Sequence, residues 1–313
     1  MRLLTVRHAS TYRYANPVTP GDHRMMLRPR DSHDLRLLNT RLMISPEPTA
    51  LRWLHDVFGN SVAIASFQCS TTELKIVSEI DLDHFESNEP DCAVESHAAT
   101  YPFSYSADEM HDLVSVIGRQ YPDPDHLLDL WAKRFVRSDG PTGTLAMLAS
   151  ITKSIKNDFG YAARNAEGVQ TPTETLRLQS GTCRDFALLM IEAVRVLGLA
   201  ARFVSGYLFS PATDNEANIG GGATHAWVQV YLPGTGWMEF DPTNGIVGNR
   251  DLIRVAVTRD PAQAIPIKGS WTGAQSDFLD LSVEVSVSSL NRNPKMDAGD
   301  CVETTNTCQR ESS

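Results

Sequence analysis

Residues 180–197 read SGTCRDFALLMIEAVRVL, a stretch in which apolar side chains recur at helical spacing. This pattern predicts a helix that packs one face into a hydrophobic core. Thr182 suits the N-cap, Asp185 suits the positive end of the helix dipole, and Gly198 suits a left-handed C-terminal cap. Cys183 would therefore lie in the first turn, where unpaired backbone N–H groups and the dipole favour the nucleophilic thiolate.

Cys183 also has a purely structural interpretation. It begins the apolar face of the predicted helix, and cysteine is often a small buried hydrophobic residue. Many buried helices begin in this way, so the thiol alone does not establish catalysis. A catalytic interpretation requires a histidine that can act as a base and a carboxylate that can orient the histidine.

The composition of the chain indicates a globular protein with an excess of acidic groups. The 313 residues are 42% hydrophobic, which is enough for two domains with proper cores. The formal net charge of −10 argues against a nucleic-acid or anionic-membrane partner, because either would require a basic face. No apolar run approaches the ~20 residues that span a bilayer, and the first residues lack the apolar core of a signal peptide. We therefore expect a soluble cytoplasmic protein.

The cysteines and histidines indicate neither a disulfide framework nor a metal site. The five cysteines stand at irregular spacing, at positions 69, 92, 183, 301 and 308. Four histidines in the first part of the chain lack carboxylate or cysteine neighbours at metal-ligand spacing: His8, His23, His33 and His55. Structural or solvated roles are expected for them, and the sequence predicts no metal and no cofactor.

The first part of the chain alternates short apolar runs with turn residues, which predicts an antiparallel β-sandwich over residues 1–84. Phe58, Gly59 and Asn60 mark a hairpin turn within it. Residues 85–123 are rich in Pro, Ser, Asp and Glu, and we expect a linker that wraps over a surface. Residues 291–313 are polar and without periodicity, which predicts a disordered tail.

Residues 124–290 are predicted to form an α+β domain, because helical periodicity comes first and strand alternation follows. The helical part ends with the stretch that contains Cys183, and the last predicted strand is DLSVEVSVSSL, residues 280–290. A flexible Gly-rich loop is expected at residues 215–222. The predicted arrangement is helices packed on an antiparallel sheet, preceded by an all-β domain.

Two of the predicted strands bring a histidine and an aspartate together. In HAWVQVYL and WMEFD, which follow the helix, the odd-numbered side chains of each strand share one face. If a hairpin pairs Tyr231 with Trp237, His225 lies diagonal to Asp241 and within side-chain reach. Asp241 would then orient His225 and leave the other ring nitrogen for Cys183. A one-residue slip would put the histidine and the aspartate on opposite faces.

Each of these residues also has an ordinary structural explanation. His225 could be a buried strand histidine bonded to the backbone, and Asp241, which precedes Pro242, could simply start a turn. The presence of all three groups in this order and local context favours a catalytic triad of Cys183, His225 and Asp241.

Three blocks of sequence resemble the core of the transglutaminase-like superfamily of papain-type cysteine enzymes. They are G-x-C-x-D-F-A at residues 181–187, H-A-W at 225–227 and D-P-T at 241–243. The chain is most similar to the bacterial branch that carries an N-terminal β domain, and the likeness extends to RPR at residues 28–30 and DVFGN at residues 56–60. The resemblance implies a papain/transglutaminase-like core after a sandwich-like β domain.

The resemblance also implies a reaction, which is cysteine-dependent acyl transfer on a peptide or isopeptide amide through a thioester. Hydrolysis is favoured, because this branch is protease-like. A protein-glutamine transglutaminase with an amine acceptor and a non-catalytic peptide-binding module are the alternatives. Relatives are often associated with ATP-grasp and α-helical proteins, which by family analogy are expected as partners beside the peptide or protein substrate.

Aromatic residues and backbone groups complete the expected site. Trp227 and Trp237 are expected to wall the substrate cleft and to exclude water, although core positions would explain them equally well. The backbone N–H of Cys183 is the natural donor for an oxyanion, whereas the sequence identifies no second donor.

Overall fold

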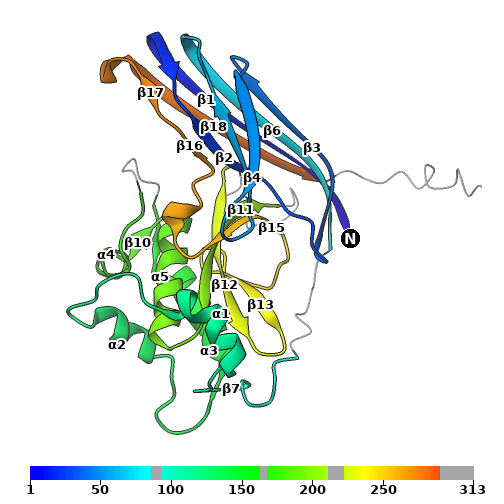
Figure 1. Ribbon diagram of the computed structural model, residues 1–313. Coiled ribbons are helices and arrows are strands. Elements are labelled where there is room, and N and C mark those ends of the chain that lie inside the picture. The colour runs from blue at the N-terminus through cyan, green and yellow to red at the C-terminus, as the bar shows by residue number, and fades with distance from the viewer. Residues whose placement is uncertain (86–92, 163–167, 211–221, 290–313) are drawn as a thin grey trace, which may run out of the picture.

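The computed structural model describes residues 1–85, 93–162, 168–210 and 222–289 (Figure 1). Figure 1 shows a β domain made of strands above an α+β domain that holds the five described α-helices. Several sequence-based expectations lie outside the described residues: the loop at residues 215–221, the tail at 291–313, and Cys92, Cys301 and Cys308.

The β domain consists of two antiparallel sheets that share a core. The larger sheet has the strand order β17-β1-β6-β3, with β18 also paired to β1. Its strands are β1 (Arg2–Pro20), β3 (Leu35–Ser45), β6 (Thr71–His84), β17 (Trp271–Thr272) and β18 (Phe278–Ser289). The smaller sheet, in the order β16-β2-β5-β4, contains β2 (His23–Arg28), β4 (Ala50–His55), β5 (Ser61–Ser66) and β16 (Ile267–Lys268). Met25, Ala63 and Ile76 from β2, β5 and β6 pack together, which confirms the predicted sandwich.

The strand β18 belongs to the β domain, which corrects the sequence-based assignment. It pairs along β1 from Leu4↔Ser289 to Tyr14↔Phe278 and contains most of the strand predicted at residues 280–290. The prediction that this strand closes the sheet of the α+β domain is therefore wrong. Local alternation predicts a strand, but the partner of a strand depends on packing between distant segments.

The α+β domain has one five-stranded antiparallel sheet in the order β14-β13-β12-β11-β15. Its strands are β11 (Ala201–Leu208), β12 (His225–Leu232), β13 (Gly236–Asp241), β14 (Ile246–Val247) and β15 (Leu252–Thr258). The helices are α1 (Ala107–Ile117), α2 (Leu127–Lys133), α3 (Thr144–Asp158), α4 (Pro172–Leu178) and α5 (Cys183–Val196). The short elements are β7 (Thr100–Tyr101), β8 (Thr142–Gly143), β9 (Gly160–Tyr161), β10 (Ser180–Gly181), η1 (Pro261–Gln263) and η2 (Gln275–Asp277). Ala187 and Ile191 of α5 pack against Val228 in one core, as the predicted α+β arrangement requires.

The segment predicted as a linker, residues 85–123, contains the helix α1. The helix begins with a capping box between Ser106 and Glu109, and its Leu113 and Val116 are buried in the core of the α+β domain. Sequence reasoning missed it because Met110 and Val114 are exposed, so the apolar residues do not form one clear stripe.

The second face of the five-stranded sheet packs against the β domain. Leu4 and Val6 of β1 share an apolar cluster with Tyr207 and Ile253 of the sheet. Asn60, in the predicted hairpin between β4 and β5, adds a polar link to β15. Its Nδ2 donates to the Val257 carbonyl at 2.7 Å, and its Oδ1 accepts from the Val257 N–H at 2.9 Å. The sheet is therefore held between α5 and the β domain.

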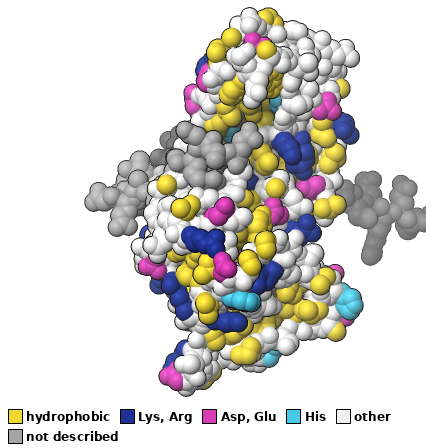
Figure 2. Space-filling view, turned by 90° about the vertical axis from the view of Figure 1, so that its left-hand side faces the viewer, with side chains coloured by type: hydrophobic (Ala, Val, Ile, Leu, Met, Phe, Trp, Pro, Cys, Tyr) yellow, Lys and Arg dark blue, Asp and Glu magenta, His cyan; other side chains and the backbone are white. Residues whose placement is uncertain are grey.

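The surface carries charges of both signs. On the face drawn in Figure 2, lysine and arginine side chains are interspersed with aspartate and glutamate. Of the helices in the described ranges, none combines the length and the apolar composition needed to cross a bilayer.

Candidate active site

The helix α5 places Cys183 at its first position. Thr182 is the N-cap: its Oγ1 accepts from the Asp185 N–H at 3.4 Å, and the Asp185 carboxylate accepts from the Thr182 N–H at 2.8 Å. Gly198, just past the helix, has a φ of +76°, as predicted for a left-handed cap. As the first helical residue, Cys183 presents a backbone N–H that has no carbonyl partner within the helix. Cys183 is buried, with 7% of its surface exposed.

The strands β12 and β13 bring His225 and Asp241 together in the predicted register. Tyr231 pairs with Trp237, which confirms the register on which the prediction depended. His225 Nε2 lies 2.8 Å from Asp241 Oδ2, and both residues are buried. A register slip of one residue would have separated them, so the turn of the hairpin determines this contact.

The carboxylate of Asp241 is held by further donors. Its Oδ1 accepts from the backbone N–H groups of Thr243 at 2.9 Å and Asn244 at 3.3 Å. Its Oδ2 also accepts from Nδ2 of Asn244 at 2.8 Å. Sequence reasoning missed Asn244, although its position directly after the D-P-T block was the available signal. These bonds orient the carboxylate toward His225 and favour its charged form.

The second ring nitrogen of His225, Nδ1, is buried and has no hydrogen-bond partner among the described residues. Besides Asp241, the thiol of Cys183 acts on the charge of the ring. Burial by itself lowers the pKa of His225, but Asp241 and Cys183 outweigh it and raise this pKa to about 10. Burial likewise opposes ionisation of Asp241, yet His225 and the hydrogen bonds lower the pKa of that carboxyl. The imidazole therefore carries its proton at neutral pH.

Tyr161 is a further member of the site that the sequence did not single out. It pairs with Gly181, two residues before the cysteine, in the parallel ladder of β9 and β10. Its hydroxyl lies close enough to the side chain of Cys183 for the two groups to interact, and its ring packs edge-on against Phe186. Burial, followed by the charge and hydrogen bond of Cys183, raises the pKa of Tyr161 to about 12, so the hydroxyl keeps its proton.

The two tryptophans do not have the predicted position at a cleft wall. Trp227 is fully buried: its Nε1 donates to Glu239 Oε2 at 2.6 Å, and its ring is stacked on His225 with centroids 5.9 Å apart. Trp227 therefore packs against the imidazole of His225 in the interior of the protein, where substrate has no access. Trp237 lies four residues before Asp241 on β13, which places it about 13 Å along the strand from the carboxylate. It lines a different cavity.

Among the described residues, no group of three or more His, Cys, Asp or Glu side chains could hold a metal ion. The chemistry that the arrangement supports is that of a thiol paired with an imidazolium.

Two family models match the chain. Residues 4–83 match the bacterial transglutaminase-like N-terminal region, and residues 131–242 match the transglutaminase-like superfamily. The second match includes Cys183, His225 and Asp241, and the first coincides with strands β1 to β6 of the β domain.

Individual proteins resemble the chain over most or part of its length. An uncharacterized protein of Mycobacterium tuberculosis is 30% identical over 290 residues, which are 90% of this chain and 91% of that protein. A protein-glutamine gamma-glutamyltransferase of Pseudomonas aeruginosa is 31% identical over 113 residues, 34% of this chain and 16% of that protein. The crystal structure of "a Putative Cysteine Protease from Cytophaga hutchinsonii" aligns with a TM-score of 0.68 and 19% identity, over 93% of this chain and 91% of that one. This last likeness is one of fold.

Proposed function

Because the chain belongs to the transglutaminase-like superfamily, we propose that it is a cysteine peptidase or amidase that cleaves a peptide or isopeptide amide. The observation that carries the proposal is the alignment of His225 between Asp241 and Cys183. One ring nitrogen is bonded to a buried carboxylate at 2.8 Å, and the thiol at the start of α5 also acts on the charge of the ring. A histidine that only fills space in the core would need neither a buried carboxylate nor a thiol beside its ring.

In the first half of the reaction, the Cys183 thiolate attacks the amide carbonyl carbon and a C–S bond forms. The carbonyl oxygen becomes an oxyanion, which accepts hydrogen bonds from the Cys183 N–H and from the Tyr161 hydroxyl. Tyr161 is thus the second donor in this proposal, and its raised pKa suits a group that must donate. The intermediate then collapses: the C–N bond breaks, and the departing amine takes the proton of the His225 imidazolium.

In the second half of the reaction, the thioester is hydrolysed. His225, now neutral, accepts a proton from water as the water attacks the thioester carbonyl. The C–S bond breaks, the acid is released, and the thiolate–imidazolium pair is restored. Asp241 holds the ring in one orientation throughout and stabilises its charged form. The proposal includes a peptide substrate, the partners expected from the resemblance and a cytoplasmic location.

Acylation with p-nitrophenyl acetate tests the mechanism without knowledge of the natural substrate. We expect a burst of p-nitrophenol and an acetyl group on Cys183, detected by mass spectrometry of the intact chain and of its peptides. Cys183→Ala should abolish both, whereas Cys69→Ala, which removes the other described free cysteine, should change neither. A burst that survives Cys183→Ala would exclude this thiol as the nucleophile.

The fate of the acyl group distinguishes hydrolysis from amine transfer. The acetylated protein is allowed to turn over in water with and without a labelled primary amine, and a glutamine peptide is offered in parallel. We expect the acyl group to appear mainly as free acid. Incorporation of the amine that outpaces hydrolysis would favour the transglutaminase alternative, while a chain that never acylates would favour the binding module.

A further inference from the structure

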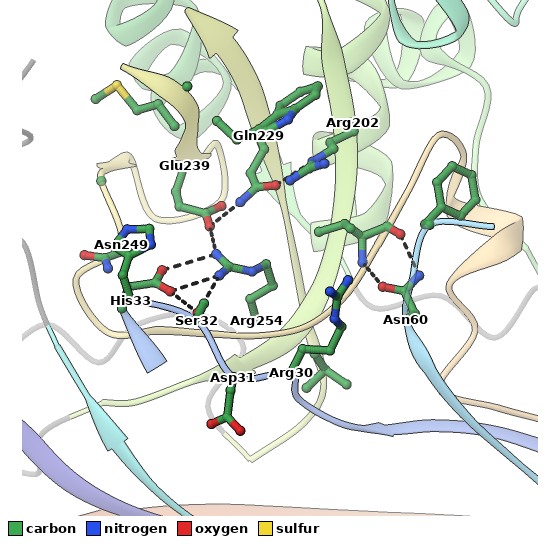
Figure 3. A pocket seen from close by; sticks show the side chains of 18 of the residues that line it. Arg30, Asp31, Ser32, His33, Asn60, Arg202, Gln229, Glu239, Asn249 and Arg254 are labelled. Carbon is green, nitrogen blue, oxygen red and sulfur yellow. Dashed lines mark hydrogen bonds and ion pairs between the residues drawn. The ribbon is translucent and has the colours of Figure 1, made fainter. Parts of the chain in front are cut away.

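A second concave site lies between the β domain and the sheet of the α+β domain. It encloses about 630 Å³, a volume typical of small-molecule sites. One wall comes from the strands β11 to β13 and β15, and the other from residues 30–34 and 58–60 of the β domain (Figure 3). Cys183, His225 and Asp241 do not line it, so it is distinct from the proposed active site.

Two carboxylates of this cavity already have partners: Glu239, which is buried, and Asp34, which is half-buried. Glu239 accepts from Gln229 Nε2 at 2.6 Å and from Arg254 Nη1 at 2.8 Å, in addition to Trp227. Asp34 accepts from Arg254 Nη2 at 3.0 Å. Figure 3 shows Arg254 joined to Glu239, and Arg254 also donates to Asp34. Arg254 is therefore paired with both carboxylates, which hold it within the wall.

Two other guanidinium groups line the cavity, as does the exposed carboxylate of Asp31. Arg202 donates through Nε to the neutral amide oxygen of Gln229 at 2.7 Å, and its charged group lies 3.9 Å from the ring centroid of Trp237. Burial lowers the pKa of Arg202 to about 10, although the nearby charge of Glu239 acts in the opposite direction. Across the cavity, the guanidinium of Arg30 lies over Gly59, where an added Cβ would come within 2.5 Å of it.

Neither Arg202 nor Arg30 forms an ion pair with any carboxylate in the described part of the chain. The amino groups of Arg202 beyond its Nε remain available toward the cavity. Arg202 is partly desolvated and has no ion pair of its own, so an anionic ligand would lower the cost of burying its charge.

We propose that this cavity binds a small organic anion, whose carboxylate or phosphate group is held by Arg202 and Arg30. Guanidinium groups suit such ligands because their planar donor pairs match the oxygens of a carboxylate or phosphate. The apolar part of the ligand packs against Trp237 and Val257, which line the same cavity. The site thus explains the position of Trp237, which the active site does not use.

Calorimetric titration of the full chain at fixed ionic strength tests this site with four probes: benzoate, phenyl phosphate, inorganic phosphate and neutral benzamide. We expect saturable binding of benzoate or phenyl phosphate, with benzamide bound at least tenfold more weakly. The stronger of the two anions identifies the ligand as a carboxylate or a phosphate ester. Inorganic phosphate lacks the apolar part and should bind more weakly than phenyl phosphate.

The substitutions Arg202→Gln and Arg30→Gln should each weaken binding of the anion by roughly 10- to 100-fold, because each removes a charge-assisted hydrogen bond. Arg202→Lys, which keeps the charge and loses the planar donor pair, should fall between wild type and Arg202→Gln. Arg41→Gln, at an exposed position on β3, is the matched control and should not change affinity. Arg30 is exposed, so Arg30→Gln carries the test if Arg202→Gln fails to fold.

Three results would overturn the proposal. They are benzamide bound as tightly as benzoate, no saturable binding of either organic anion, and unchanged affinity in Arg30→Gln. None of these outcomes depends on catalysis by Cys183, so the proposed function stands or falls separately.

Discussion

Asp241→Asn should lower the free energy of unfolding by about 2–4 kcal/mol at pH 6, even though the two side chains have the same shape. The carboxylate of Asp241 is fully buried and accepts hydrogen bonds at both oxygens. In asparagine, one of these oxygens becomes an NH2 group. If the NH2 group replaces Oδ1, it meets the N–H groups of Thr243 and Asn244; if it replaces Oδ2, it meets the donors of His225 and Asn244. Either orientation leaves two donors unsatisfied, at about 1–3 kcal/mol each before the structure relaxes.

The loss should depend on pH because the substitution also removes the charge that faces His225. The pKa of His225 is raised from 6.5 to about 10, so the stability that this ion pair contributes is complete below pH 6.5 and is lost as the pH rises through about 10. The pKa of Asp241 is lowered, so its share is present above the ordinary value and is lost only as the pH falls through the lowered one. The difference between wild type and Asp241→Asn should therefore shrink by at least about 1 kcal/mol between pH 6 and pH 10.5.

Urea unfolding of both proteins at pH 6 and pH 10.5 measures this difference. Asp251→Asn is a suitable control, because Asp251 is also buried and pairs with Arg2 at 2.6 Å, a partner that stays charged throughout this range. Its loss should be the same at both pH values. A loss below about 1 kcal/mol for Asp241→Asn at pH 6, or one that does not change with pH, would refute the assignment of a charged His225–Asp241 pair.

Three further substitutions separate the roles of neighbouring groups. Tyr161→Phe should slow acylation of Cys183 by about 10- to 100-fold but leave its alkylation by iodoacetamide unchanged, because alkylation forms no oxyanion; equal losses in both rates would point to a structural role. Thr182→Ala should cost about 1 kcal/mol of stability in urea, and Thr171→Ala, which removes the equivalent capping box from the short helix α4, is its comparison. Gly206→Ala should cost about 1–3 kcal/mol and slow acylation, because a Cβ there would lie 2.1 Å from the Ile253 carbonyl and 2.6 Å from Trp227, the ring that supports His225. Gly118→Ala, whose Cβ would meet no atom closer than 3.6 Å, should change neither property.

The contact between His225 and Asp241 could be predicted because short-range rules determine it. Strand alternation places the side chains on one face, and the length of the hairpin loop determines the register. The helix cap at Thr182 is similarly local, since donor and acceptor are three residues apart. These features require no knowledge of the rest of the fold.

Features that depend on distant segments could not be predicted in this way. Tyr161 reaches Cys183 only because the two-residue ladder of β9 and β10 forms, and such short pairings leave no periodic signal. Trp227 is buried because it packs with Val204, Leu208 and Leu252 of the neighbouring strands, and alternation along one strand does not predict that packing. The same limit explains the wrong partner assigned to β18, whose pairing with β1 spans nearly the whole chain.

That last pairing has a consequence for biosynthesis. The strand β1 leaves the ribosome first among the strands, and β18 leaves it after the entire α+β domain. Until then, one side of β1 lacks the neighbour that covers it from Leu4 to Tyr14 in the folded protein. Unpaired strand edges recruit other chains, so the nascent β domain is exposed to aggregation for as long as the intervening residues are being translated. The α+β domain, whose sheet is formed by consecutive segments, can fold during that interval and bring β18 back to its partner.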